Sequence, residues 1–127
     1  MKGIIISIII AVLLFLGAMM LSSKQSQSTS IPANNVSVID GKQIIEIKAK
    51  GGYQPRTSVG KAGIPTVIRF NTDGTFDCSA SVRIPSLNIS KILPQSGSVD
   101  IDIGIPQAGI LRGTCGMGMY PFAIDFQ

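Results

Sequence analysis

The distribution of apolar and polar residues divides the chain into an apolar start, a short polar stretch and a longer part with alternating character. Residues Gly3 to Leu21 carry no charge over nineteen positions, and Lys2 precedes them. About 20 apolar residues are enough to cross a bilayer as a helix. We therefore predict a signal anchor with one transmembrane helix over residues 1–22. Removal of this segment as a signal peptide, by cleavage after Ser22 or Ser23, is the alternative, although the apolar run is long for that class.

The predicted anchor sets an expected topology for the rest of the chain. Lys2 and the free amino terminus favour the cytoplasmic side by the positive-inside rule, with Lys24 opposing them weakly. We therefore expect a single-pass protein of the cell membrane whose remaining residues lie on the extracytoplasmic side, either periplasmic or extracellular. Residues 23–37 are rich in Ser, Gln and Asn, which predicts a flexible polar tether. The folded domain is expected over residues 38–127.

Beyond residue 38 the pattern changes to the two-residue period of β-strands. In the segment QIIEIKAK, Ile45, Ile47 and Ala49 share one parity, and in TVIRF Val67 alternates with Arg69. Clusters of Gly, Pro, Asn and Asp separate the apolar runs at short intervals and indicate turns. Many short strands with such turns predict an all-β domain, an antiparallel sandwich or barrel. The other predicted strands cover residues 80–84, 98–103, 110–115 and 122–126, whereas residues 86–93 fit a helical turn or a loop.

Composition narrows the classes of function. The chain contains no histidine, so it cannot form a Ser/His/Asp triad, a His-activated thiolate, a His-containing zinc finger or a blue-copper site with imidazole ligands. Its net charge of +4 comes from Lys and Arg residues scattered singly along the chain, and we expect no nucleic-acid partner. Cys78 and Cys115 are the only cysteines, too few for a four-cysteine zinc site.

The segment TCGMGMY places three sulfur atoms at alternate positions, those of Cys115, Met117 and Met119. Alternate side chains of an extended backbone point to the same side, and the intervening glycines allow the loop to curl around a ligand. Thiolates and thioethers are soft ligands that select copper(I) or silver(I). Cys78 is the candidate second thiolate, provided that the fold brings it to the same end of the domain.

Three segments, in order along the chain, resemble the cupredoxin family, specifically its bacterial plastocyanin-like domains in which the copper histidines are replaced. Residues 53–70 (YQPRTSVGKAGIPTVIRF) are similar to the family's entry into its sandwich. Residues 71–84 (NTDGTFDCSASVRI) are similar to the segment that supplies the first histidine, and residues 107–126 (QAGILRGTCGMGMYPFAIDF) to the final ligand hairpin. The resemblance covers nearly the whole predicted domain and implies a Greek-key β-sandwich or barrel.

The resemblance also implies roles for individual residues. Cys78 stands where the family has its first histidine, Cys115 falls on the ligand cysteine, and Met119 falls on the axial methionine. Met117 has no counterpart in the family and is a candidate fourth ligand. Because both histidines are replaced, the resemblance implies copper binding, trafficking or sequestration, as in copper-handling relatives of bacterial envelopes.

The leading hypothesis is a membrane-tethered copper(I)-binding module that buffers copper, or exchanges it with a donor or acceptor protein that the sequence does not identify. Cupredoxin-type electron transfer is the runner-up. A third hypothesis, from another class, is a structural or interaction sandwich that binds no metal and has a disulfide between Cys78 and Cys115. An enzyme is the least favoured class, because Asp73 and Asp77 fit solvated turn carboxylates and the C-x-x-C motif of thiol oxidoreductases is missing.

Overall fold

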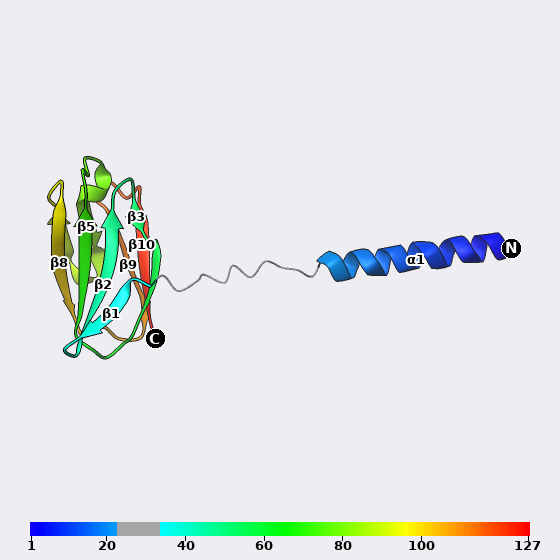
Figure 1. Ribbon diagram of the computed structural model, residues 1–127, viewed down its shortest axis with the longest axis horizontal. Coiled ribbons are helices and arrows are strands. Elements are labelled where there is room, and N and C mark those ends of the chain that lie inside the picture. The colour runs from blue at the N-terminus through cyan, green and yellow to red at the C-terminus, as the bar shows by residue number, and fades with distance from the viewer. Residues whose placement is uncertain (23–33) are drawn as a thin grey trace. The chain divides into compact units, whose positions relative to one another are not determined.

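The computed structural model describes residues 1–22 and 34–127, which belong to two compact units, a helix and a β-sandwich (Figure 1). The helix, α1, runs from Lys2 to Ser22 without a proline to interrupt it. Within the described residues, the structure identifies no helix long and apolar enough to cross a membrane. Most of the predicted tether, residues 23–33, lies outside the described residues.

The sandwich consists of two five-stranded sheets. The first sheet has the order β1-β2-β5-β8, with β3 off this path and paired to the last two residues of β2, and the second has the order β4-β10-β9-β6-β7. The strands of the first sheet are β1 (Val36–Ile39), β2 (Lys42–Ala49), β3 (Tyr53–Gln54), β5 (Thr66–Thr72) and β8 (Gly97–Gly104). Those of the second are β4 (Thr57–Gly60), β6 (Ser81–Ile84), β7 (Ile89–Ile92), β9 (Gly109–Cys115) and β10 (Pro121–Phe126). Two short 3₁₀ turns, η1 (Cys78–Ala80) and η2 (Pro85–Leu87), flank β6.

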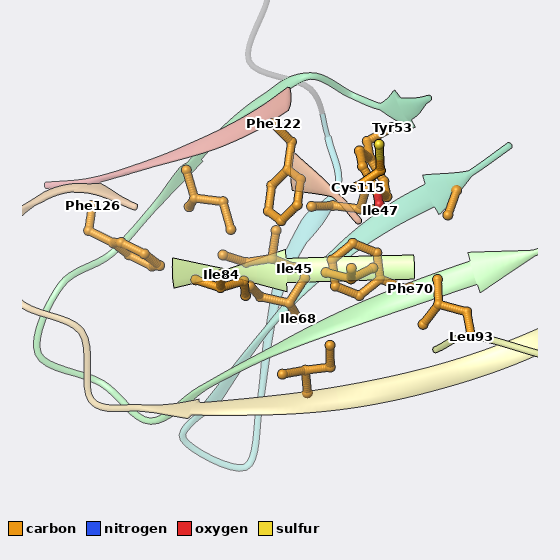
Figure 2. Close-up of a cluster of buried hydrophobic side chains, with 14 residues drawn as sticks. Ile45, Ile47, Tyr53, Ile68, Phe70, Ile84, Leu93, Cys115, Phe122 and Phe126 are labelled. Atoms are coloured by element: carbon orange, nitrogen blue, oxygen red, sulfur yellow. The ribbon is translucent and has the colours of Figure 1, made fainter. Parts of the chain in front are cut away.

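The alternating pattern of the sequence places the core between the two sheets. Ile45, Ile47 and Ala49 all point inward from β2 and are buried, as their shared parity predicts. Three aromatic rings, those of Tyr53, Phe70 and Phe122, meet edge to face with centroids 5.0–5.9 Å apart. Figure 2 shows this cluster together with Cys115, which is part of the core.

The strand pairing corrects the expectation of a purely antiparallel sandwich. β2 pairs with β5 in parallel, and β4 pairs with β10 in parallel, while the other pairings are antiparallel. Parallel neighbours need a connection that crosses over. Here the chain leaves the first sheet after β3, forms β4 in the second sheet and returns as β5, so that β2 and β5 run in the same direction.

Two boundaries also differ from the sequence-based expectations. Residues 86–93, expected as a helical turn or a loop, begin with the end of the 3₁₀ turn η2 and continue as the strand β7, which was not expected and pairs with β6 at the sheet edge. Strand pairing begins at Val36, two residues before the expected start of the domain, because Val36 pairs with Ile45 and packs against the core.

Candidate metal centre

Cys115 is the last residue of β9 and points into the sandwich. It follows the inward parity of its strand, is 0% exposed and belongs to the core. Residues 116–120 then form the turn to β10, in which the N–H of Gly118 donates to the carbonyl of Cys115 at 2.9 Å. Gly118 has a φ of 75°, which favours glycine, so the residue type that the sequence provides suits this turn.

Cys78 opens the short turn η1, and Asp77 caps that turn. The Asp77 carboxylate accepts hydrogen bonds from the Ser79 N–H at 2.8 Å and from the Ser79 hydroxyl. It also accepts from the N–H of Gly51 at 2.7 Å, in the loop between β2 and β3. Asp77 therefore ties the turn that carries Cys78 to the first sheet, while β6 continues from the same turn into the second sheet.

The structure brings Cys78 and Cys115 together. Their Cα atoms are 5.7 Å apart, and the two sulfurs are bonded as a disulfide across 37 positions of sequence. The juxtaposition follows from strand register, because Val82 of β6 lies opposite Cys115 of β9 and Cys78 enters β6 through a single 3₁₀ turn. The two cysteines therefore lie at the same end of the domain, as a site with two cysteine ligands requires.

The two methionines of the loop are exposed beside this pair. Met117 is 80% and Met119 is 61% exposed, and the N–H of Met117 donates to Cys78 Sγ at 3.4 Å. Within residues 1–22 and 34–127, no three His, Cys, Asp or Glu side chains gather where a metal could bind. If a metal ion binds to the cysteine pair, the methionine thioethers of the loop are therefore the side chains that could serve as its further ligands. The roles of Cys78, Cys115, Met117 and Met119 as ligands remain predictions.

One carbonyl joins the loop to the core. The carbonyl oxygen of Ser81 accepts from the N–H of Gly116 at 3.1 Å and from the hydroxyl of Tyr53 at 3.0 Å. A Cβ at position 116 would stand 2.8 Å from the Ser81 hydroxyl, so glycine permits this close approach. The start of the loop is therefore held by main-chain contacts in addition to the disulfide.

Two ionisable groups near the pair have shifted pKa values, one through hydrogen bonds and the other through burial. The Ser79 hydroxyl, followed by the N–H groups of Ser79 and Gly51 and the charge of Lys50, holds the pKa of Asp77 below its usual value. Burial, with a smaller effect from Asp77, raises the pKa of Tyr53, which stays a neutral hydrogen-bond donor at physiological pH.

Asp77 and Tyr53 are the supporting residues that sequence reasoning did not identify. The available signal for Asp77 was the order Asp-Cys-Ser, because an Asp side chain commonly accepts a hydrogen bond from the backbone two residues on. For Tyr53 the local sequence carried no such signal, because its partner Ser81 lies 28 positions away.

The model of the cupredoxin-like domain family matches residues 10–123 of the chain. Among solved structures, a copper binding protein in its apo form is 26% identical, with a TM-score of 0.67 over 72% of this chain and 94% of that one. The metal binding domain of the Streptococcus pneumoniae D39 Cu(I) exporting P-type ATPase CopA, solved with Cu(I), is 24% identical, with a TM-score of 0.66 over 72% of this chain and 92% of that domain. A search of curated proteins found no match.

Proposed function

Since the chain belongs to the cupredoxin-like domain family, we propose that it is a copper(I)-binding protein that buffers the ion or passes it to a partner. Cys78, Cys115 and Met119 are the proposed ligands, and Met117 is the candidate fourth. Silver(I), which has similar ligand preferences, is the alternative cargo.

The observation that carries this proposal is the convergence of two distant cysteines at a glycine-rich methionine loop. The Cα atoms of Cys78 and Cys115 are 5.7 Å apart, and the loop with Met117 and Met119 begins at the second cysteine. In the dithiol form the pair provides two thiolates, and the loop adds two thioethers. This donor set fits a soft monovalent ion and lacks the imidazoles that copper(II) sites use.

The structural neighbours support the choice of copper. One is described as a copper binding protein and the other as the metal binding domain of a Cu(I) exporter, and both share the fold of this chain. The open position of the loop supports exchange with a partner. Because Met117 and Met119 are mostly exposed, an ion at this site would be within reach of a second protein that replaces the ligands one at a time.

Competition with a chromogenic copper(I) chelator tests the proposal on the reduced full-length protein. Thiolates hold copper(I) more strongly than thioethers, so Cys78→Ser and Cys115→Ser should weaken binding far more than Met119→Leu. Met117→Leu should have the smallest effect of the four variants. Phe76→Leu is the matched control, since Phe76 is exposed nearby and has no donor atom.

Two outcomes would favour the other candidate functions. If the reduced protein takes up no copper(I), the Cys78–Cys115 disulfide favours a structural or interaction sandwich without metal. If copper(II) produces an intense visible thiolate absorption that cycles with reduction, electron transfer replaces trafficking. Unchanged affinity in both cysteine variants would refute the site assignment while leaving copper binding itself intact.

Attachment to the membrane is part of the proposal and is supported by the sequence. Residues 3–21 carry no charge and follow Lys2, which favours an anchor with its amino terminus in the cytoplasm. The full-length chain should then sediment with membranes, and protease added to spheroplasts should digest the β-sandwich. A variant lacking residues 2–21 is the control. A native chain that begins near Lys24 in mass spectrometry, or a sandwich protected in intact spheroplasts, would contradict this topology.

A further inference from the structure

The two cysteines of the Cys78–Cys115 disulfide are unequally exposed. Cys115 is 0% exposed and packs in the core, whereas Cys78 is partly exposed. Phe76, two residues before Cys78, is 77% exposed, and Met117, whose N–H contacts Cys78 Sγ, is also mostly exposed. A dissolved reagent can therefore reach the bond from the side of Cys78 and is kept from Cys115 by the core.

We propose that the pair is a redox gate for the copper site, and that Cys78 Sγ is the atom at which a dithiol reductant attacks. The gate rests on the proposed function, because it controls the ligands of that site. As a disulfide the pair has no thiolate to offer, so it cannot hold copper(I) with the two sulfur anions that the site needs. As a dithiol it provides both.

The exchange proceeds in two balanced steps. A reductant thiolate attacks Cys78 Sγ, the bond between the two cysteine sulfurs breaks, and Cys115 leaves with the electron pair as a thiolate. The second thiolate of the reductant then attacks the reductant's own sulfur in the mixed disulfide and releases Cys78 as a thiolate. The chain gains two electrons, the reductant becomes a disulfide, and each freed thiolate takes up a proton or the copper ion.

The contacts around the pair hold the site in place when the bond opens. Gly116 remains joined to Ser81 through the main chain, and the N–H of Cys115 donates to the carbonyl of Tyr120 at 3.1 Å. Asp77 anchors the turn of Cys78 to Gly51. None of these hydrogen bonds involves the disulfide, so both cysteines keep their positions after reduction.

Copper and reduction are linked because the ion binds only the dithiol form. At free copper(I) concentrations above the dissociation constant, each tenfold rise increases the equilibrium ratio of reduced to oxidised protein tenfold. The midpoint potential of the pair then moves about 30 mV in the positive direction. The midpoint of the full-length protein in detergent is measured without oxygen, in mixtures of oxidised and reduced dithiothreitol. The reduced fraction is read from the mass added by alkylation. Because dithiothreitol also binds copper(I), free copper(I) is read in each sample from the chromogenic chelator.

A second measurement identifies the atom that is attacked. The oxidised protein is exposed briefly to reduced glutathione, quenched with acid and an alkylating agent, and digested with trypsin. Cleavage after arginine places the two cysteines on separate peptides, residues 70–83 and 113–127. Glutathione should be found on the first peptide, which contains Cys78, and the alkylating agent on the second.

The outcomes separate the gate from the function on which it rests. Glutathione on Cys115 would overturn the assigned point of attack. A disulfide that reacts only after denaturation, or a midpoint that ignores copper(I) although the reduced protein binds it, would overturn the gate and leave copper binding intact. Exchange at Cys78 in a protein whose reduced form binds no copper(I) would refute the proposed function while leaving the exchange site supported.

Discussion

Opening the Cys78–Cys115 disulfide is expected to lower the free energy of unfolding by about 4 kcal/mol. The bond closes a loop across 37 positions of sequence. In the chain-entropy model, closing a loop of that length lowers the conformational entropy of the unfolded chain, which stabilises the folded state by about 4 kcal/mol at 25 °C. For a domain of about 100 residues, each kcal/mol shifts the melting temperature by about 4–8 °C. The reduced domain should therefore melt about 15–30 °C below the oxidised one.

Copper(I) is expected to restore most of this loss. A ligand that binds only the folded protein at about 1,000 times its dissociation constant contributes about 4 kcal/mol, close to the cost of opening the disulfide. The free energy of unfolding of the reduced, copper-free protein should thus be well below that of the oxidised and copper(I)-loaded proteins. Urea unfolding followed by circular dichroism measures all three, and equal slopes against urea would show that the same surface unfolds.

The Cys78→Ser variant is the control for both effects. It has no disulfide, so reductant should leave its stability unchanged, and it lacks one thiolate, so copper(I) should stabilise it much less. Equal stability of the oxidised and reduced forms, within about 1 kcal/mol, would refute the entropy argument. Equal stabilisation of the variant and the unaltered chain by copper(I) would refute the link between the ion and this cysteine pair.

Three further predictions concern the scaffold and its pH dependence. A Cβ at Gly113 would overlap the ring of Phe122, so Gly113→Ala should cost about 1–3 kcal/mol, and adding Phe122→Leu should recover part of this loss. Additive losses of the two substitutions in urea unfolding would contradict this packing. Hydrogen bonds from Arg69 lower the pKa of Asp100 in the folded protein, so this exposed pair adds a small stabilisation that is present above about pH 4 and is lost as the pH falls through the lowered value. The difference in stability between Asp100→Asn and the unaltered chain should therefore shrink as the pH falls below about 4, and a constant difference would count against the pair. Tyr53→Phe should lower the free energy of unfolding by about 1 kcal/mol at pH 7, because it removes the hydrogen bond to Ser81. It should also make stability less sensitive to pH above about 10, because burial raises the pKa of this hydroxyl in the folded state and its contribution is lost as the pH rises. Parallel pH profiles of the two proteins would contradict this.

Local pattern predicted the longer strands whose inward positions are mostly apolar. The inward residues of β2 alternate in the sequence as they do in the structure, and β8, β9 and β10 lie within one residue of the expected segments 98–103, 110–115 and 122–126 at each end. β1, β3, β4 and β7 were not predicted as strands. β1 and β7 are four-residue edge strands with only one partly buried residue each, so burial imposes no alternation on their sequences. β3 has only two residues, and the buried positions of β4 are Ser58 and Gly60, which give no apolar signal.

For the candidate site, the sequence predicted the type of ligand atoms, but it did not predict that Cys78 and Cys115 come into contact. The sulfur spacing of Cys115, Met117 and Met119 is a local feature, and the absence of histidine is a matter of composition. The contact of Cys78 with Cys115 depends on which residue of β6 lies opposite the end of β9. A shift of one residue in that pairing would turn side chains to the other face of the sheet, so register rather than composition brings the two sulfurs together.

By itself, the amino-acid sequence determined the inward parity of the central strands and the soft character of the candidate ligands, because each depends on residues a few positions apart. Only the tertiary structure decided the parallel pairings, the burial of Cys115 against the partial exposure of Cys78, and the anchoring of Cys78 through Asp77 to Gly51. These features arise between segments that meet only when the two sheets pack. Their physical cause is the burial of both inner sheet faces together, which no single segment can accomplish.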